Sequence, residues 1–117
     1  MTKEISHFVA PLPAKTTGRF VQVFVEKEPF IRFSLKDEDT HEDILIELLN
    51  EYIQSGKNKK TINYESAGKG FYKTLKDKTI QLYGDVYMPP VHPNKGHLDK
   101  LTPYLPKEIK IEIKEDY

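Results

Sequence analysis

One long amphipathic helix constrains the fold more than any other feature of the sequence. Thr40 followed by Asp43 has the spacing of a helix start, and Gly56 is suited to end the helix. Between them the apolar side chains recur at helical spacing and form one stripe: Ile44, Leu45, Leu48, Leu49, Tyr52 and Ile53. This helix has to bury its stripe against other elements, and the rest of the chain reads mainly as strands.

Two strand patterns precede the helix. The run 19–26 is apolar on both faces, which is typical of a central strand covered on two sides. The run 30–35 follows a turn at 27–29 and has one face that is expected to be wetter, formed by Arg32 and Ser34. These two runs are expected to form a hairpin.

The patterns after the helix predict four more strands and a short helix. The strands are expected at 61–65, 71–75, 79–83 and 108–114, with a glycine turn at 67–70, and the short helix at 97–105. Prolines exclude regular structure from 88–96. The sequence therefore predicts an α/β (α+β) domain in which a mixed sheet of about six strands packs against two helices, in the order ββαβββαβ.

Length and composition limit the classes of protein. The 117 residues suffice for one domain at 18–117, preceded by an arm at 1–17 with at most one short strand at 6–9. The 18 basic and 18 acidic side chains balance, which argues against a nucleic-acid or membrane-surface partner, and Lys57, Lys59 and Lys60 are read as a solvated loop. Without cysteine, long apolar runs or the order of a signal peptide, we expect a cytoplasmic protein.

His41 is the strongest candidate for chemistry. It lies in the first turn of the long helix, where unpaired backbone N–H groups can hold a phosphate and the helix dipole favours a neutral imidazole. A neutral imidazole can act as a base or as a nucleophile. The alternative is that His41 is simply a helix-start residue at the edge of the core. Glu42 and Asp43 compete for the same amides, and Asp43 could instead cap the helix onto Thr40.

Two further groups of residues are candidates for a phosphate site and a metal site. Gly68-Lys69-Gly70 could let the backbone approach a phosphate, but the segment lacks the remaining residues of a P-loop, and a plain glycine turn between two strands is the favoured explanation. His92, His97 and Asp99 match no standard metal spacing, so we expect neither a metal nor a cofactor.

Several of these signals occur together in one known family. The chain resembles the Janus/Ocnus family, which includes the small protein-histidine phosphatase, from about Gly18 to Tyr117. The resemblance rests on the helix start His41-Glu42-Asp43-Ile44, on the glycine-containing segment 65–70, and on the strand 80–84 that ends in Tyr-Gly and is followed by His92. It implies the fold of that family and phosphoryl chemistry.

The resemblance also implies roles for individual residues. His41 would be the catalytic histidine, and the backbone amides of His41, Glu42, Val86 and Met88 would bind the phosphate of a phosphorylated protein or a small phospho-substrate. Val21 stands where the family has a lysine on the first strand. Arg19, Arg32 or Lys69 could supply the missing cation. A second family position, an arginine, is taken here by Phe71, and Asp85, Pro89 and Pro90 make the loop after Tyr-Gly unlike that of the family.

The leading interpretation is therefore a phosphohistidine-phosphatase-like hydrolase centred on His41. The alternative is a non-catalytic module on the same scaffold that binds a protein partner or a phospho-ligand. The proline-containing loop 88–93 and the lost cations favour this second interpretation.

Overall fold

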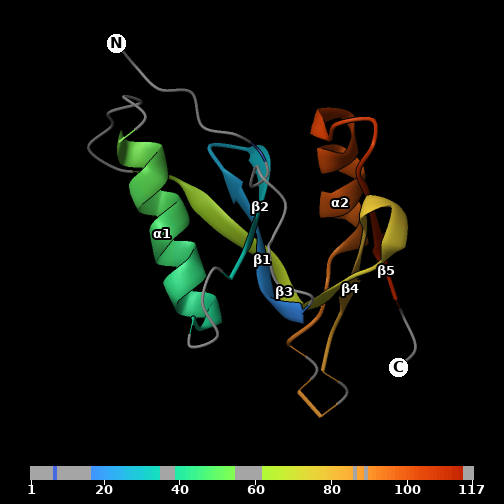
Figure 1. The fold of residues 1–117 in the computed structure, drawn as a ribbon. Coiled ribbons are helices and arrows are strands. Elements are labelled where there is room, and N and C mark those ends of the chain that lie inside the picture. Colours follow the sequence, from blue (N-terminus) through green and yellow to red (C-terminus); the bar gives the residue numbers. More distant parts are fainter. Residues whose placement is uncertain are drawn as a thin grey trace.

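The computed structural model describes residues 7, 17–34, 39–54, 62–85, 87–88 and 90–114. It is an α+β fold in which a mixed five-stranded sheet packs against two helices (Figure 1). The strands are β1 (Thr17–Val25), β2 (Glu28–Phe33), β3 (Tyr64–Thr74), β4 (Thr79–Tyr83) and β5 (Lys110–Ile113). The helices are α1 (His41–Gln54) and α2 (Lys95–Leu101), and two short 3₁₀ turns, η1 (Lys76–Lys78) and η2 (Thr102–Tyr104), complete the elements.

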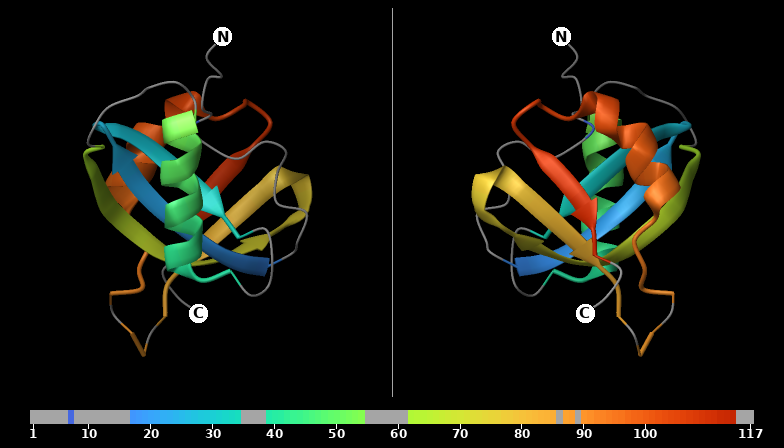
Figure 2. Two further views of the ribbon diagram at one scale, coloured as in Figure 1. Left: turned by 90° about the vertical axis from the view of Figure 1, so that its left-hand side faces the viewer. Right: turned by 90° about the vertical axis from the view of Figure 1, so that its right-hand side faces the viewer.

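The sheet places β1 at the centre of the molecule. Its strand order is β2-β1-β3-β4-β5, and among the described strands the β4–β5 pair is parallel and the others are antiparallel. A parallel pair needs a crossover connection, which α2 provides. The two helices cover opposite faces of the sheet, so β1 is buried on both sides (Figure 2).

The side chains of β1 alternate between two cores, as the sequence predicts. On one face Val21, Val23 and Val25 pack under α1 with its residues Ile44 and Leu48. On the other face, residues of β1, β2, β3, β4, α2 and β5 form a second cluster, with members Phe20, Phe33, Tyr72, Leu82 and Leu101 among others. The predicted long helix is observed as α1, and the hairpin of the first two strands is confirmed, while Gly56, the expected end of the helix, lies outside the described residues.

The predicted glycine turn at 67–70 is wrong. Residues 64–74 form one continuous strand, β3, so the sheet has five strands rather than about six and the order is ββαββαβ. A β-bulge occurs where Gln22 pairs with Gly68 while Val23 pairs with Ser66, which leaves Ala67 as the extra residue. A Cβ on Gly70 would lie 2.4 Å from the carbonyl oxygen of Tyr83, so close contact explains this glycine without a turn.

The first hairpin also differs in detail from the expectation. The turn lies at Glu26 and Lys27, whose φ angles are 51° and 70°, and Pro29 belongs to β2. Proline is tolerated there because β2 is an edge strand of the sheet. Arg32 and Ser34, expected on a wetter face, are both buried. The Arg32 guanidinium lies against α1, where Glu51 accepts two hydrogen bonds from it, so a buried position carries a paired charge.

The chain ends add two smaller differences. Of the arm at 1–17, and of its strand predicted at 6–9, only His7 and Thr17 are among the described residues. The carbonyl oxygen of His7 accepts a hydrogen bond from the N–H of Ile31, and the His7 ring stacks on the rings of Phe30 and Tyr104.

The second helix begins at Lys95, two residues before the predicted start, and becomes a 3₁₀ turn at Thr102, next to Pro103. Neither helix in the described part of the chain has the length and apolar character needed to cross a membrane.

Candidate functional site

The start of α1 is fixed by a capping box. The N–H of Asp43 donates to Thr40 Oγ1 at 3.1 Å, and the N–H of Thr40 donates to Asp43 Oδ2 at 3.0 Å. The hydrogen bond from the Thr40 N–H, followed by one from the Thr40 side chain, lowers the pKa of the Asp43 carboxyl. The Asp43 carboxylate therefore binds backbone at the cap. The N–H groups of His41 and Glu42 belong to the first turn and have no acceptor within the helix.

His41 is held against the sheet by its ring. Nε2 lies 2.9 Å from the carbonyl oxygen of Gly70. A carbonyl can only accept, so Nε2 carries the proton and the Nδ1 atom of the neutral ring keeps a lone pair. The ring also makes an edge contact with Phe71, with centroids 5.8 Å apart. The residue is thus part of a defined contact between α1 and β3, with one ring nitrogen left for chemistry.

The surroundings of His41 favour its neutral form. Partial burial is the main cause that lowers its pKa, and the positive charges of Lys69 and Arg19 lower it further. The hydrogen bond to Gly70 acts in the opposite direction but is outweighed. An imidazole with a pKa below 6.5 is mostly unprotonated at neutral pH, as a base or nucleophile requires.

A cavity of about 300 Å³ opens beside His41, between α1 and the bulged part of the sheet. Its apolar wall comes from β1, α1 and the segment before α2, and its polar wall from the helix start and from β3. The lining residues are Val21, Val23, His41, Glu42, Leu45, Ser66, Ala67, Gly68, Lys69 and Pro90. The cavity therefore brings His41 and the glycine-containing segment together, although they are far apart in the sequence.

The three cations considered from the sequence differ in their placement. Lys69 lines the cavity, and Arg19 lies close enough to act on His41 while it donates to the carbonyl oxygen of Asp39. Arg32 is 5% exposed and forms two hydrogen bonds to Glu51, at 3.2 and 3.1 Å. Lys69 is consequently the cation available to a ligand in the cavity.

The loop after β4 is organised by its own hydrogen bonds. The carbonyl oxygen of Asp85 accepts from the N–H of Met88 at 3.0 Å, and Asp85 Oδ1 accepts from the N–H of Tyr87 at 2.9 Å. The amide of Met88, a predicted phosphate ligand, is thus engaged within the loop. Val86, the other predicted ligand of this loop, lies outside the described residues. Pro90 is the residue of this loop that lines the cavity with His41.

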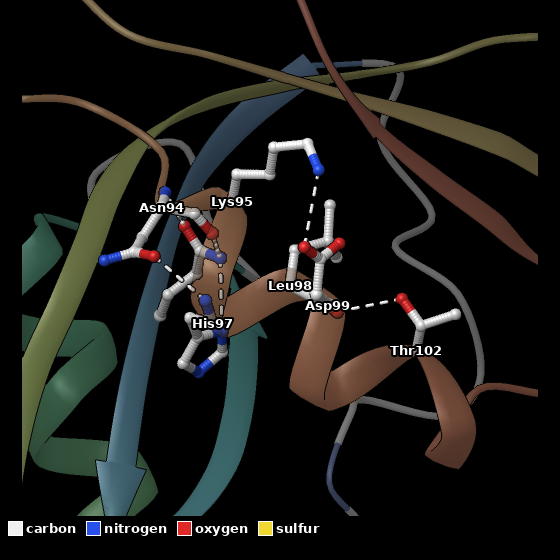
Figure 3. Close-up of polar contacts among 7 residues, drawn as sticks. Asn94, Lys95, His97, Leu98, Asp99 and Thr102 are labelled. Atoms are coloured by element: carbon white, nitrogen blue, oxygen red, sulfur yellow. Dashed lines mark hydrogen bonds and ion pairs between the residues drawn. The ribbon is translucent and has the colours of Figure 1, made fainter.

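A buried polar network lies behind the cavity, on the opposite face of the sheet. Gln22 Nε2 donates to Asn94 O at 3.0 Å and contacts His97 Nδ1 at 3.1 Å, while Gln22 Oε1 accepts from Asn94 N at 2.7 Å. Asn94 in turn caps α2 by accepting from the N–H of His97 (Figure 3). The network fixes the segment before α2 onto β3, because Asn94 Nδ2 also donates to Ala67 O.

His97 has a structural role in this network. Its Nε2 donates to Val23 O at 3.1 Å, so its Nδ1 accepts from Gln22 in the neutral ring. Burial is the main cause that lowers its pKa. His92 is exposed, and Asp99 pairs with Lys95, so these residues do not converge on a metal site. Over the described ranges, no group of three metal-ligating side chains occurs. Sequence reasoning missed this network, and an apolar strand interrupted by Gln22 was its only signal.

The comparisons with known proteins leave the site to be interpreted from its geometry. No protein-family model matches the sequence, and a search of curated proteins finds no match.

Proposed function

We propose that the protein is a phosphoryl hydrolase of the protein-histidine phosphatase type, with His41 as its catalytic residue. The observation that carries the proposal is the hydrogen bond from His41 Nε2 to Gly70 O beside the cavity. This bond fixes the tautomer and leaves Nδ1 unprotonated. Among the described residues, none hydrogen-bonds to Nδ1. The resemblance to the Janus/Ocnus family adds the expectation that the reacting group is phosphoryl.

Two features favour an anion next to this ring. The N–H groups of His41 and Glu42 point out of the helix start, where the helix dipole is positive. Lys69 adds a full positive charge at the cavity wall. The carboxylate of Glu42 opposes them. In the proposed complex, the two amides and Lys69 stabilise the charge on the phosphoryl oxygens as it shifts during transfer.

The Nδ1 atom can take part in either of two balanced reactions. As a base, it takes a proton from a water molecule whose oxygen attacks phosphorus. The bond from phosphorus to the leaving group then breaks, and the leaving group keeps the electron pair and receives the proton. As a nucleophile, Nδ1 forms the new bond to phosphorus while the bond from phosphorus to the leaving group breaks, and the leaving group keeps the electron pair and takes a proton from water. Water then attacks the phosphohistidine, the phosphorus–nitrogen bond breaks, and Nδ1 regains its lone pair. In both reactions the proton stays on Nε2 and is donated to Gly70 O, and this hydrogen bond stabilises the cationic ring.

The test is hydrolysis of a phosphoramidate by the wild-type protein and by His41→Ala. The variant should lose activity by about 10²–10⁴-fold, the usual contribution of a positioned acid, base or nucleophile. His92→Ala is the matched control, because its exposed side chain lies outside the cavity. A wild-type protein without activity, or a His41→Ala protein with full activity, would refute the proposed catalysis.

A second candidate function is the binding of a protein partner without catalysis. The favouring observation is the loop after β4, where Tyr87 is 89% exposed and Met88 is 56% exposed although the loop is held by Asp85. The described part of this connection projects beyond the end of the sheet (Figure 1). This function predicts a partner complex that survives His41→Ala and is lost with Tyr87→Ala. Recovery of the partner by Tyr87→Ala at wild-type level would exclude this loop as the interface.

A further inference from the structure

The cavity beside His41 is polar at one end and apolar at the other. The position of α1 establishes this order: its first residue, His41, bonds to Gly70, which pairs with Phe20. Further along the helix, Tyr52 contacts Phe30, which pairs with Val23. The helix therefore runs along β1 from the level of Phe20 towards the level of Val23.

The lining residues follow the same direction. Lys69 pairs with Val21, at the His41 end of the cavity. Leu45 lies one turn after His41 on the same side of the helix, towards Val23. The cavity thus has His41 and Lys69 at one end, whereas Val23 and Leu45 form an aliphatic wall at the other, with Ser66 beside Val23.

The volume indicates the size of ligand that the cavity as a whole can hold. At about 30 Å³ for each water molecule in the liquid, the cavity of about 300 Å³ has room for about ten waters. Small-ligand sites commonly combine apolar walls of this kind with a few polar groups that fix orientation. A phosphoryl group on a single ring or a short branched chain is of this size. A free phosphate would leave the aliphatic wall without a contact.

We propose that the cavity binds a small organic phosphate, with the phosphoryl group at His41 and Lys69 and a compact apolar group against Val23 and Leu45. The inference rests on the proposed function in taking the anion to be a phosphoryl group. It adds that the ligand is selected by its apolar part. Lys69 and Arg19 place positive charges near the His41 end, where the Glu42 carboxylate opposes them, and both cations lower the pKa of the His41 ring.

The test compares the affinities of three probes by calorimetry: phenyl phosphate, inorganic phosphate and benzoate. The wild-type protein should bind phenyl phosphate about tenfold or more tighter than inorganic phosphate, because the ring leaves water for the aliphatic wall. It should also bind phenyl phosphate tighter than benzoate, which has the ring but a different anion. Equal affinity for phenyl phosphate and inorganic phosphate would overturn the inference, and equal affinity for benzoate would overturn its phosphoryl part.

Two variants locate the apolar group. Ala67→Leu fills the cavity and should bring the affinities for the two phosphates within about threefold of each other, since the ring then has no room. Val23→Thr changes the volume little but puts a hydroxyl in the aliphatic wall, so it tests the same contact if the larger side chain disturbs the bulge. Asn50→Leu, on the exposed side of α1 and outside the cavity, is the control and should retain the preference. A preference retained by Ala67→Leu and Val23→Thr would place the ring elsewhere and refute the inference.

The outcome also separates this inference from the proposed function. Selective binding of phenyl phosphate without phosphoramidate hydrolysis would refute the hydrolase and support the ligand class. Hydrolysis that depends on His41, together with equal affinity for the two phosphates, would support the hydrolase and refute the ligand class.

Discussion

His41 Nε2 and the carbonyl oxygen of Gly70, 2.9 Å apart, join the first residue of α1 to β3. This one contact sets the tautomer of the ring, its distance from Lys69 and the position of the helix start on the sheet. The position of His41 beside the cavity and the lone pair on its Nδ1 atom therefore depend on the same hydrogen bond.

Removing the charge of Lys69 should raise the pKa of His41. Burial lowers this pKa most, but Lys69 also lowers it because a nearby positive charge disfavours the imidazolium. In Lys69→Ala the midpoint of the ring titration, followed by NMR, should move to higher pH. Lys73→Ala, a matched change at an exposed position on the same strand, should leave the midpoint in place. An unchanged midpoint in Lys69→Ala would contradict the electrostatic description of the site.

The folded protein should lose stability as the pH falls below about 6.5. His41 and His97 both have a lowered pKa in the folded state, with burial as the main cause, so in this range the unfolded chain binds more protons. Each histidine contributes at most about 1.4 kcal/mol per pH unit to the loss of unfolding free energy. The contribution is absent above the unfolded pKa and grows until the pH reaches the lowered pKa of the folded state.

Urea unfolding at a series of pH values measures this effect. His97→Gln should reduce the pH dependence, because it removes one of the two groups. His92→Gln is the same substitution at an exposed position outside the network and should keep the wild-type dependence. A wild-type unfolding free energy that stays constant between pH 7 and about 5 would contradict the prediction.

Gly68→Ala should destabilise the protein although the residue lies in a strand. A Cβ at this position would lie 2.8 Å from Gln22 Oε1 and 2.9 Å from both Asn94 N and His92 O. Two of these atoms belong to the backbone, so the segment before α2 would have to move, at a cost of about 1–3 kcal/mol. Ser66→Ala, at an exposed position two residues earlier, is the control for denaturation experiments. Similar unfolding free energies for the two variants would show that this close packing is unimportant.

Glu51→Ala should destabilise the protein by about 1–3 kcal/mol, because it removes the carboxylate that accepts two hydrogen bonds from the buried Arg32. The remaining partners of the guanidinium include the Ile31 carbonyl oxygen and the ring of Phe30. Glu47→Ala, at an exposed position of the same helix, should change the unfolding free energy much less. Replacing the pair together, Arg32→Met with Glu51→Ala, should recover part of the loss. Equal effects of the two glutamate substitutions would refute this role.

The features that the sequence predicted are those encoded by local periodicity. The stripe from Ile44 to Tyr52 marks α1, and the alternation from Phe20 to Val25 marks a strand buried on both faces. The capping residues Thr40 and Asp43 also identify the helix start from sequence alone. In each case the signal and the structure lie within the same few residues.

The features that it missed depend on distant partners. The glycines of β3 indicate a turn when read locally, but their reason is the close approach of residues 92–94 and of the Tyr83 carbonyl oxygen. In the sequence, Arg32 alternates with apolar residues as an exposed strand position does. In the fold it is buried because Glu51 of α1 pairs with it. For the candidate site, His41 is identifiable from its place at a helix start, whereas its bond to Gly70 requires the fold.

The alternation along β1 gives experimenters two independent views of the protein. The methyl groups of Val21 and Val23 face the cavity, while the amide of Gln22 between them faces His97 on the other side of the sheet. Adjacent labels in one strand would thus register ligand entry and histidine protonation as separate chemical-shift changes. A titration in which the valine and Gln22 signals shift together would show that ligand binding and histidine protonation are coupled across β1.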